Sequence, residues 1–151
     1  MGAIFLSKLQ EILEDLTGFI IKSGKYTRIF YDDSTMDPNT SLPALSYKVG
    51  EMKQEKPSGC DEYVKELEIR RHTATLDKNK LLMELWDFEE EIITLIRRGG
   101  VNGELSTRHS IELEYHKTYP IGALVYKRHE DNKEVFFSNL LRVAFKLRYT
   151  L

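Results

Sequence analysis

The sequence is poor in the residues that covalent or metal-based chemistry needs. It has one cysteine, Cys60, which excludes an intrachain disulfide and a zinc site built from several cysteines. Cys60 lies in a polar stretch without an adjacent basic or histidine residue to activate its thiol, which argues against a catalytic role. A single thiol also fits a reducing compartment.

The sequence also lacks the marks of membrane and nucleic-acid-binding proteins. No apolar run reaches the roughly 18 residues that a membrane-spanning helix needs. Residues 1–7 lack the basic start and the small-residue cleavage site of a signal peptide. The net charge is -2, so no overall positive field attracts a phosphate backbone. We therefore expect no membrane partner, no specific nucleic acid, and a protein made in the cytosol with its N-terminus intact.

Motifs of known catalytic chemistry are absent from the sequence. It contains no phosphate-binding loop, dinucleotide-binding, zinc-protease or serine-hydrolase pattern. His109 and His116 are seven residues apart on a predicted strand, so they face opposite ways and do not pair as ligands. The acidic run around Glu89–Glu91 spreads round the solvent side of a predicted helix. The sequence therefore predicts no catalytic residue, no cofactor and no metal ligand.

The chain has enough apolar residues to form one packed core. Hydrophobic residues make up 41% and charged residues 30% of its 151 positions, a mixture that argues against wholesale disorder. The length is near that of one ordinary domain, so residues 1–151 are predicted to fold as one. The sequence contains no repeat of 20 to 50 residues, which argues against a solenoid.

Two segments have the three- and four-residue apolar spacing of amphipathic helices. The first is predicted over 3–23, with Gly24 as its stop, because glycine accepts the left-handed conformation there. The second is predicted over 78–98, capped by Asp77 and ended by Gly99-Gly100. Its predicted buried face comprises Leu81, Leu82, Leu85, Phe88, Ile92, Leu95 and Ile96.

Six further segments have strand character, and polar stretches separate them. The predicted strands are 26–31, 42–49, 62–73, 109–119, 121–127 and 141–151, with loops at 32–41, 50–61, 101–107 and 129–133. Pro43 predicts an edge or a strand-entry position for 42–49, and the Glu66, Glu68 and Arg70 side of 62–73 is predicted to face water. The predicted fold is α+β: a largely antiparallel sheet with two amphipathic helices on one face.

Opposite charges lie on the predicted outer faces of these strands. The basic set comprises Arg70, Arg71, His72, Arg142, Lys146 and Arg148, and the acidic set comprises Glu66, Glu68, Glu112 and Glu114. If the strands are neighbours, these charges favour cross-strand pairs, which need no second protein. A charged surface for a partner of opposite sign stays open as the alternative.

The whole layout resembles the phage tail terminator (tail-completion) family. An N-terminal amphipathic helix leads to the strand LPALSYKV at 42–49. The alternating strand YVKELEIRRHTA then runs directly into the helix NKLLMELWDFEEEIITLIRR, and the chain ends on LLRVAFKLRYTL. The resemblance lies in the order of elements over nearly the full length, and not in a fingerprint residue.

This resemblance implies a structural protein without catalysis or cofactor. Such a protein forms a homo-oligomeric ring, commonly a hexamer, that caps the finished tail tube, ends its polymerisation and offers a head-joining surface. The implied partners are other copies of itself, the tail tube protein, a head-completion or connector protein and a sheath protein. The implied location is the head-proximal end of the virion tail, with the host cytoplasm as the site of assembly.

Ring contacts are predicted in the loops at 32–41, 50–61 and 99–108, because long polar loops on a rigid sheet reach neighbouring copies. The candidate interface residues are Asp32, Asp33, Lys53, Lys56, Arg97, Arg98 and Arg108. An exposed strand edge at 42–49 is a second candidate contact. Two alternatives stay open: another head-tail completion or tail-assembly binding module, and a small enzyme whose site joins residues distant in sequence.

Overall fold

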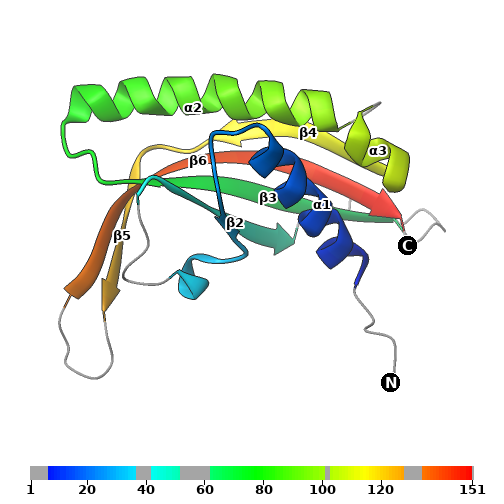
Figure 1. The fold of residues 1–151 in the computed structure, drawn as a ribbon, viewed down its shortest axis with the longest axis horizontal. Coiled ribbons are helices and arrows are strands. Elements are labelled where there is room, and N and C mark those ends of the chain that lie inside the picture. The colour runs from blue at the N-terminus through cyan, green and yellow to red at the C-terminus, as the bar shows by residue number, and fades with distance from the viewer. Residues whose placement is uncertain (1–6, 37–41, 52–61, 101–102, 128–133, 151) are drawn as a thin grey trace.

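A computed structural model describes residues 7–36, 42–51, 62–100, 103–127 and 134–150 (Figure 1). The predicted α+β fold is confirmed: a six-stranded, mostly antiparallel sheet carries the helices on one face. The helices are α1 (Lys8–Lys22), α2 (Lys78–Gly99) and α3 (Glu104–Arg108), with a 3-10 turn η1 (Asp33–Thr35). The strands are β1 (Ile29–Phe30), β2 (Ala44–Glu51), β3 (Glu62–Thr73), β4 (Ile111–Thr118), β5 (Gly122–Lys127) and β6 (Glu134–Thr150).

The long strand β6 organises the sheet. The strand order is β1-β2-β3-β6-β4, and β5 also pairs with β6. β3 runs along one side of β6, and β4 and β5 follow each other along the other side. Tyr119–Ile121 separates these two strands, so the predicted break between the strands 109–119 and 121–127 is confirmed. β1 and β2 form the parallel pair, and the other pairs are antiparallel.

α1 begins and ends where the sequence supplies the matching signals. The Ser7 hydroxyl accepts a hydrogen bond from the Gln10 backbone N–H (3.2 Å), and the Gln10 side chain accepts one from the Ser7 N–H (2.9 Å). Gly24 has φ 87°, which confirms it as the predicted stop. The prediction of a helix over 3–23 is wrong at Ser7, which is extended and forms the cap, and residues 3–6 lie outside the described part of the chain. Ile12, Leu13, Leu16 and Ile20 bury the apolar stripe against the sheet.

α2 confirms its predicted cap and most of its predicted buried face. The Asp77 carboxylate accepts hydrogen bonds from the backbone N–H groups of Asn79 (2.9 Å) and Lys80 (3.1 Å). The side chains that it buries are Leu81, Leu85, Phe88, Ile92 and Ile96. Leu95 is half-buried, and the prediction for Leu82 is wrong, because its side chain is 40% exposed. At 100° per residue, Leu82 lies beyond the strip of helix that the sheet covers.

Four segment predictions needed correction. Only Ile29–Phe30 of the predicted strand 26–31 joins the sheet, and the predicted connector 101–107 contains the start of α3. β6 begins at Glu134, well before the predicted 141, because its first part pairs with β5. β1 pairs with β2 at Leu45 and Ser46. Among the described residues, β2 is therefore an edge strand on that side from Tyr47 onward, and not over the whole predicted length. The predicted loop at 129–133 falls outside the described residues.

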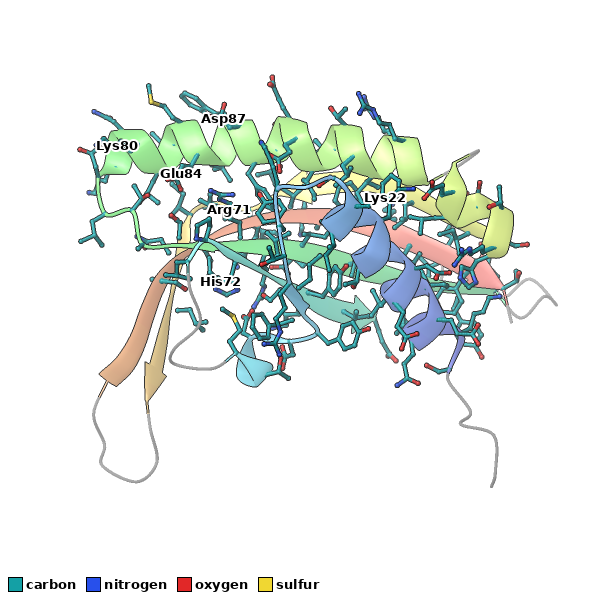
Figure 2. The ribbon with its side chains drawn as sticks, viewed as in Figure 1. Lys22, Arg71, His72, Lys80, Glu84 and Asp87 are labelled. Atoms are coloured by element: carbon teal, nitrogen blue, oxygen red, sulfur yellow. The ribbon has the colours of Figure 1, made fainter. Side chains whose placement is uncertain are left out.

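The face of β3 that was predicted to be wet is covered at one end. Glu68, Arg70 and His72 are all buried, although they lie on the sheet face opposite the helices. The segment from β1 to η1 folds beneath this face, where Phe30 and Met36 pack with Ala44 in a small second cluster. Figure 2 shows the alternation, with Arg71 on the helix side of β3 and His72 on the other side. At this end the sheet is therefore covered on both faces, by helices on one side and by the β1–η1 segment on the other.

Candidate interface surfaces

Among the described residues, the largest set of side chains joined by hydrogen bonds is a buried cluster beneath the sheet. It joins Asp33 of η1, Ser46 of β2, Arg70 and His72 of β3, and Ser138 of β6. His72 lies 2.7 Å from the Ser46 hydroxyl through Nε2 and 3.1 Å from the Ser138 hydroxyl through Nδ1. Neither serine has exposed surface, and His72 is fully buried. The cluster therefore joins three strands and η1 through buried side chains.

Asp33 is the anionic centre of this cluster. Its carboxylate accepts hydrogen bonds from Ser46 and Arg70, and its Oδ1 lies 3.2 Å from His72 Nε2. Burial alone would raise the pKa of Asp33, but hydrogen bonds from His72 and Ser46 and the charge of Arg70 outweigh it. The pKa falls from 3.8 to about 2. A second carboxylate, that of Glu68, accepts from Arg70 Nε at 3.0 Å, so Arg70 has an acid on each side.

A second cluster joins α1 to the chain that enters β4. His109 Nε2 lies 2.6 Å from Asp15 Oδ2, and Arg108 donates to Asp15 Oδ1 at 3.0 Å. His109 is buried and caps α3, so its place on the predicted strand 109–119 is wrong, and its Nδ1 has no hydrogen-bond partner among the described residues. Asp15 and Arg108 also line a cleft of about 470 Å³ between α1 and α3, which the Lys22–Glu104 ion pair (3.4 Å) spans. The cluster ties two helices together.

Replacing Asp15 with alanine is expected to lower the free energy of unfolding by about 1–2 kcal/mol. The change removes the charged partner of the buried His109 imidazole. Arg108→Ala is the matched control: its side chain is 70% exposed, so the loss is expected to stay under about 0.5 kcal/mol. Urea unfolding of the two variants measures the difference. Equal losses in both would contradict a structural role for the Asp15–His109 contact.

On the sheet face opposite the helices, residues of opposite charge lie across from each other on neighbouring strands, as predicted. The register places Lys146 of β6 opposite Glu66 of β3 on one side and Glu114 of β4 on the other. Arg148 of β6 lies opposite Glu112 of β4, and its guanidinium is 3.6 Å from the Glu62 carboxylate. Arg70 and His72 do not extend a basic face, because both are buried in the cluster around Asp33. The prediction is wrong for Arg71, which lies on the helix side of β3 and donates to Tyr26. The alternative of a partner of opposite charge stays a prediction.

The candidate interface residues fall into three groups. Asp32, Arg97, Arg98 and Arg108 are exposed. Asp33 is buried and bonded internally, so a contact with a neighbouring copy would first have to disrupt the cluster. Lys53 and Lys56 lie outside the described residues, as do parts of the predicted contact loops 32–41 and 50–61. In the third loop, 99–108, α3 takes up the end of the segment.

An apolar surface that the sequence reasoning did not single out lies on α2. Met83 and Trp86 are each 60% exposed, and Leu82 beside them is 40% exposed. The three side chains are neighbours, because residues three and four apart meet on a helix surface. We call Leu82, Met83 and Trp86 the α2 patch. Its signal in the sequence is the presence of a tryptophan and a methionine outside the regular stripe of the helix.

The orientation of α2 determines which way the α2 patch faces. Glu91 forms an ion pair with Lys25, beside the C-terminal end of α1, and Phe19 of α1 packs closely against Gly99. Leu82 is nine residues from Glu91, which is half a revolution round the helix axis. The α2 patch therefore lies on the outer surface away from α1 and toward the β4 side of the sheet, where β6 is the one strand beside β4 within the described residues.

The comparisons with known proteins give no family assignment. No protein-family model matches the sequence, and no curated protein matches it at a significant level. Among the described residues, no helix is long and apolar enough to cross a membrane. Within the same residues, no group of three or more histidine, cysteine, aspartate or glutamate side chains is arranged to hold a metal ion.

Proposed function

We propose that this protein is a structural assembly component of a phage tail or tail-like particle. It caps the tail tube as a homo-oligomeric ring, ends tube polymerisation and provides the surface that joins the head. The observation that supports this proposal best is the order of elements. α1 precedes β2 and β3, β3 leads within a few residues into α2, and β4 and β6 complete the sheet, as in the family that the sequence resembles.

The surfaces of the protein are compatible with such an assembly. A tryptophan and a methionine exposed side by side on α2 form the kind of apolar surface that proteins use in contacts. β4 offers one strand edge, and Tyr47–Glu51 of β2 offers another on the opposite side of the sheet. Two different surfaces on one chain are what a closed ring requires.

The burial of the serine and histidine side chains in the two polar clusters supports a structural role over the enzyme alternative. Ser46, His72 and Ser138 are each fully buried, so their hydroxyl and imidazole groups are not presented to a substrate. His109 has 7% of its side chain exposed and its Nε2 is engaged by Asp15. An assembly protein needs such clusters only to hold its sheet and helices in place.

The proposal predicts a tail tube gene beside the gene for this chain, and it is tested by polymerising that tube protein with and without the purified protein. With it, tubes are expected to stop at a limited length and to show a ring at one end in electron micrographs. Particles assembled without it are expected to carry overlong tubes that do not join heads. Tubes of normal, uniform length with functional head joining in its absence would refute the proposal. A strict monomer that binds an unassembled tail protein would favour the tail-assembly binding module.

A further inference from the structure

The α2 patch is exposed although it carries the single tryptophan of the sequence. Trp86 and Met83 are each 60% exposed, and Leu82 beside them is 40% exposed. Figure 1 shows α2 as the outermost layer, with the sheet on one side of it and no described segment on the other. Exposed apolar side chains that adjoin each other mark surfaces that another protein covers. The charged residues around the patch indicate which protein that is.

Charged side chains of both signs lie on either side of the α2 patch. At about 100° per residue, Lys80 and Asp87 lie on the flank of the patch nearer to α1, and Lys78 and Glu89 lie on the other flank. The first three are exposed and Glu89 is half-buried. Figure 2 shows Lys80 and Asp87 on α2. The ion pairs among the described residues involve none of these four side chains.

The order of these charges along α2 is complementary to itself when a second α2 runs antiparallel. In such a pair, residues that are equally far from the two-fold axis on its two sides face each other, and each flank meets the same flank of the second copy. With the axis just after Met83, Lys80 and Asp87 are equally far from it on opposite sides. Lys78 and Glu89 are also equally far from it, two residues further out. Each lysine thus faces a carboxylate of the second copy, on both flanks.

We propose that the α2 patches of two copies of this chain pack on each other in an antiparallel, two-fold contact. The register brings Met83 of both copies together at the axis, and it places Leu82 of each copy beside Trp86 of the other. The Lys80–Asp87 and Lys78–Glu89 pairs enclose this apolar centre, and each pair occurs twice. An apolar centre with a charged rim is the usual anatomy of a protein interface.

The charges select the antiparallel orientation. In a parallel pair, Lys80 would lie against Lys80 of the second copy and Asp87 against Asp87, and such like-charge contacts suppress binding. Glu90 follows Trp86 by four residues on the same strip of helix. The antiparallel register places Glu90 beside the first turn of the second α2, where the helix dipole favours a negative charge.

This contact goes beyond the proposed ring. A two-fold contact is complete with two copies, whereas a ring needs two different surfaces on each copy. The contact uses neither the β4 edge nor the β2 edge, so it pairs single copies or whole rings alike. The overlapping part of the two helices, residues 78–89, is about 18 Å long. Because this overlap is short, the expected dimer is a weak one with a micromolar dissociation constant.

The first test uses the fluorescence of Trp86, since no other tryptophan contributes to the emission. As the purified chain is concentrated from about 1 μM to about 1 mM, a range that brackets a micromolar dissociation constant, the emission is expected to shift to shorter wavelength. Quenching by acrylamide is expected to weaken in parallel. An emission maximum and a quenching constant that stay the same over this range would overturn the inference.

The second test compares the mass of two variants with that of the wild type by light scattering. Trp86→Asp is expected to weaken the contact at least about 30-fold, the loss typical of a central interface tryptophan. At high concentration the wild-type mass is therefore expected to be twice that of Trp86→Asp, whether or not the chain also forms rings. Thr94→Asp is the matched control, because Thr94 is exposed on α2 outside the overlap, and it should match the wild type. Equal masses for wild type and Trp86→Asp would contradict the contact.

Exchanging charges tests the antiparallel register. Lys80→Glu and Asp87→Lys each bring like charges together twice in a dimer of that variant, so each is expected to associate about 5- to 10-fold more weakly at low salt. The double variant restores opposite charges, as does an equimolar mixture of the two single variants, and both are expected to associate like the wild type. A double variant as weak as the single variants would rule out this register. Circular dichroism checks that every variant is folded.

The outcome is separable from that of the proposed function, because all three tests use the purified chain without tube protein. Dimers that depend on Trp86, formed by a chain that leaves tube length unchanged, would support the inference and refute the terminator role. Tube capping by a wild-type chain whose Trp86 emission never changes with concentration would support the terminator role and overturn the inference.

Discussion

Replacing Asp33 with asparagine is expected to lower the free energy of unfolding by about 3 kcal/mol at neutral pH. The change leaves the buried Arg70 guanidinium without its partner in η1 and removes the anion that Ser46 and His72 contact. Removing one member of a buried ion pair costs this much because the other charge stays desolvated. Urea unfolding, followed by circular dichroism, measures the loss.

The loss is expected to shrink in acid, and its sign follows from the lowered pKa. The pKa of Asp33 is about 2 in the folded protein against 3.8 for the ordinary group. The stability that its charge contributes is therefore complete above about pH 4 and disappears as the pH falls toward 2. A shift of this size corresponds to about 2 kcal/mol. Wild type and Asp33→Asn should thus differ less at pH 2.5 than at pH 7.

Asp32 provides the matched control for this prediction. It is the neighbouring carboxylate and is exposed, so Asp32→Asn is expected to change the stability by less than about 0.5 kcal/mol at either pH. Unfolding of Asp33→Asn at the same urea concentration as the wild type at pH 7 would show that the cluster beneath the sheet does not hold η1 in place.

Replacing Phe88 with alanine is expected to cost about 3–5 kcal/mol of unfolding free energy. Phe88 is 2% exposed in the centre of α2 and belongs to the main core between the helices and the sheet. The truncation removes a large apolar side chain and leaves a cavity that the close-packed sheet beneath fills only in part. Thermal or urea unfolding of the two chains measures this loss.

Leu82→Ala is the informative control for Phe88→Ala. The sequence pattern places both residues on the buried face of α2, whereas the structure leaves Leu82 40% exposed. Its truncation is expected to cost less than about 1 kcal/mol in dilute solution, below the concentration at which copies associate. Comparable losses for the two variants would mean that the α2 patch is covered within a single chain.

The sequence allowed accurate prediction wherever a local signal is sufficient. Asp77 is followed by free backbone N–H groups, so the start of α2 is decided within four residues. Gly24 stops α1 because it accepts a positive φ at little cost. The alternation along β3 gave its bounds, Glu62–Thr73. The pattern of charged residues along β3, β4 and β6 also predicted that opposite charges face each other across neighbouring strands.

The candidate site could be predicted only in part. Arg97, Arg98 and Arg108 are exposed as a surface role requires, but Asp33 is not. The burial of Asp33 depends on Ser46, His72 and Ser138, which lie 13, 26 and 66 residues from their bonded partners in the cluster. No local pattern reports contacts over such separations. Trp86 and Met83 were missed because a periodic pattern finds the core stripe and does not evaluate the apolar residues beside it.

The sequence by itself determined the α+β class, the two capped helices and the strands with alternating faces, because these depend on backbone preferences and spacing within a few residues. The tertiary structure alone decided that η1 folds beneath the sheet and buries His72, that β6 extends past the end of β3 paired with β5, and that Trp86 stays exposed. Each of these depends on which distant segment occupies the space beside a side chain, and only the packed chain establishes that.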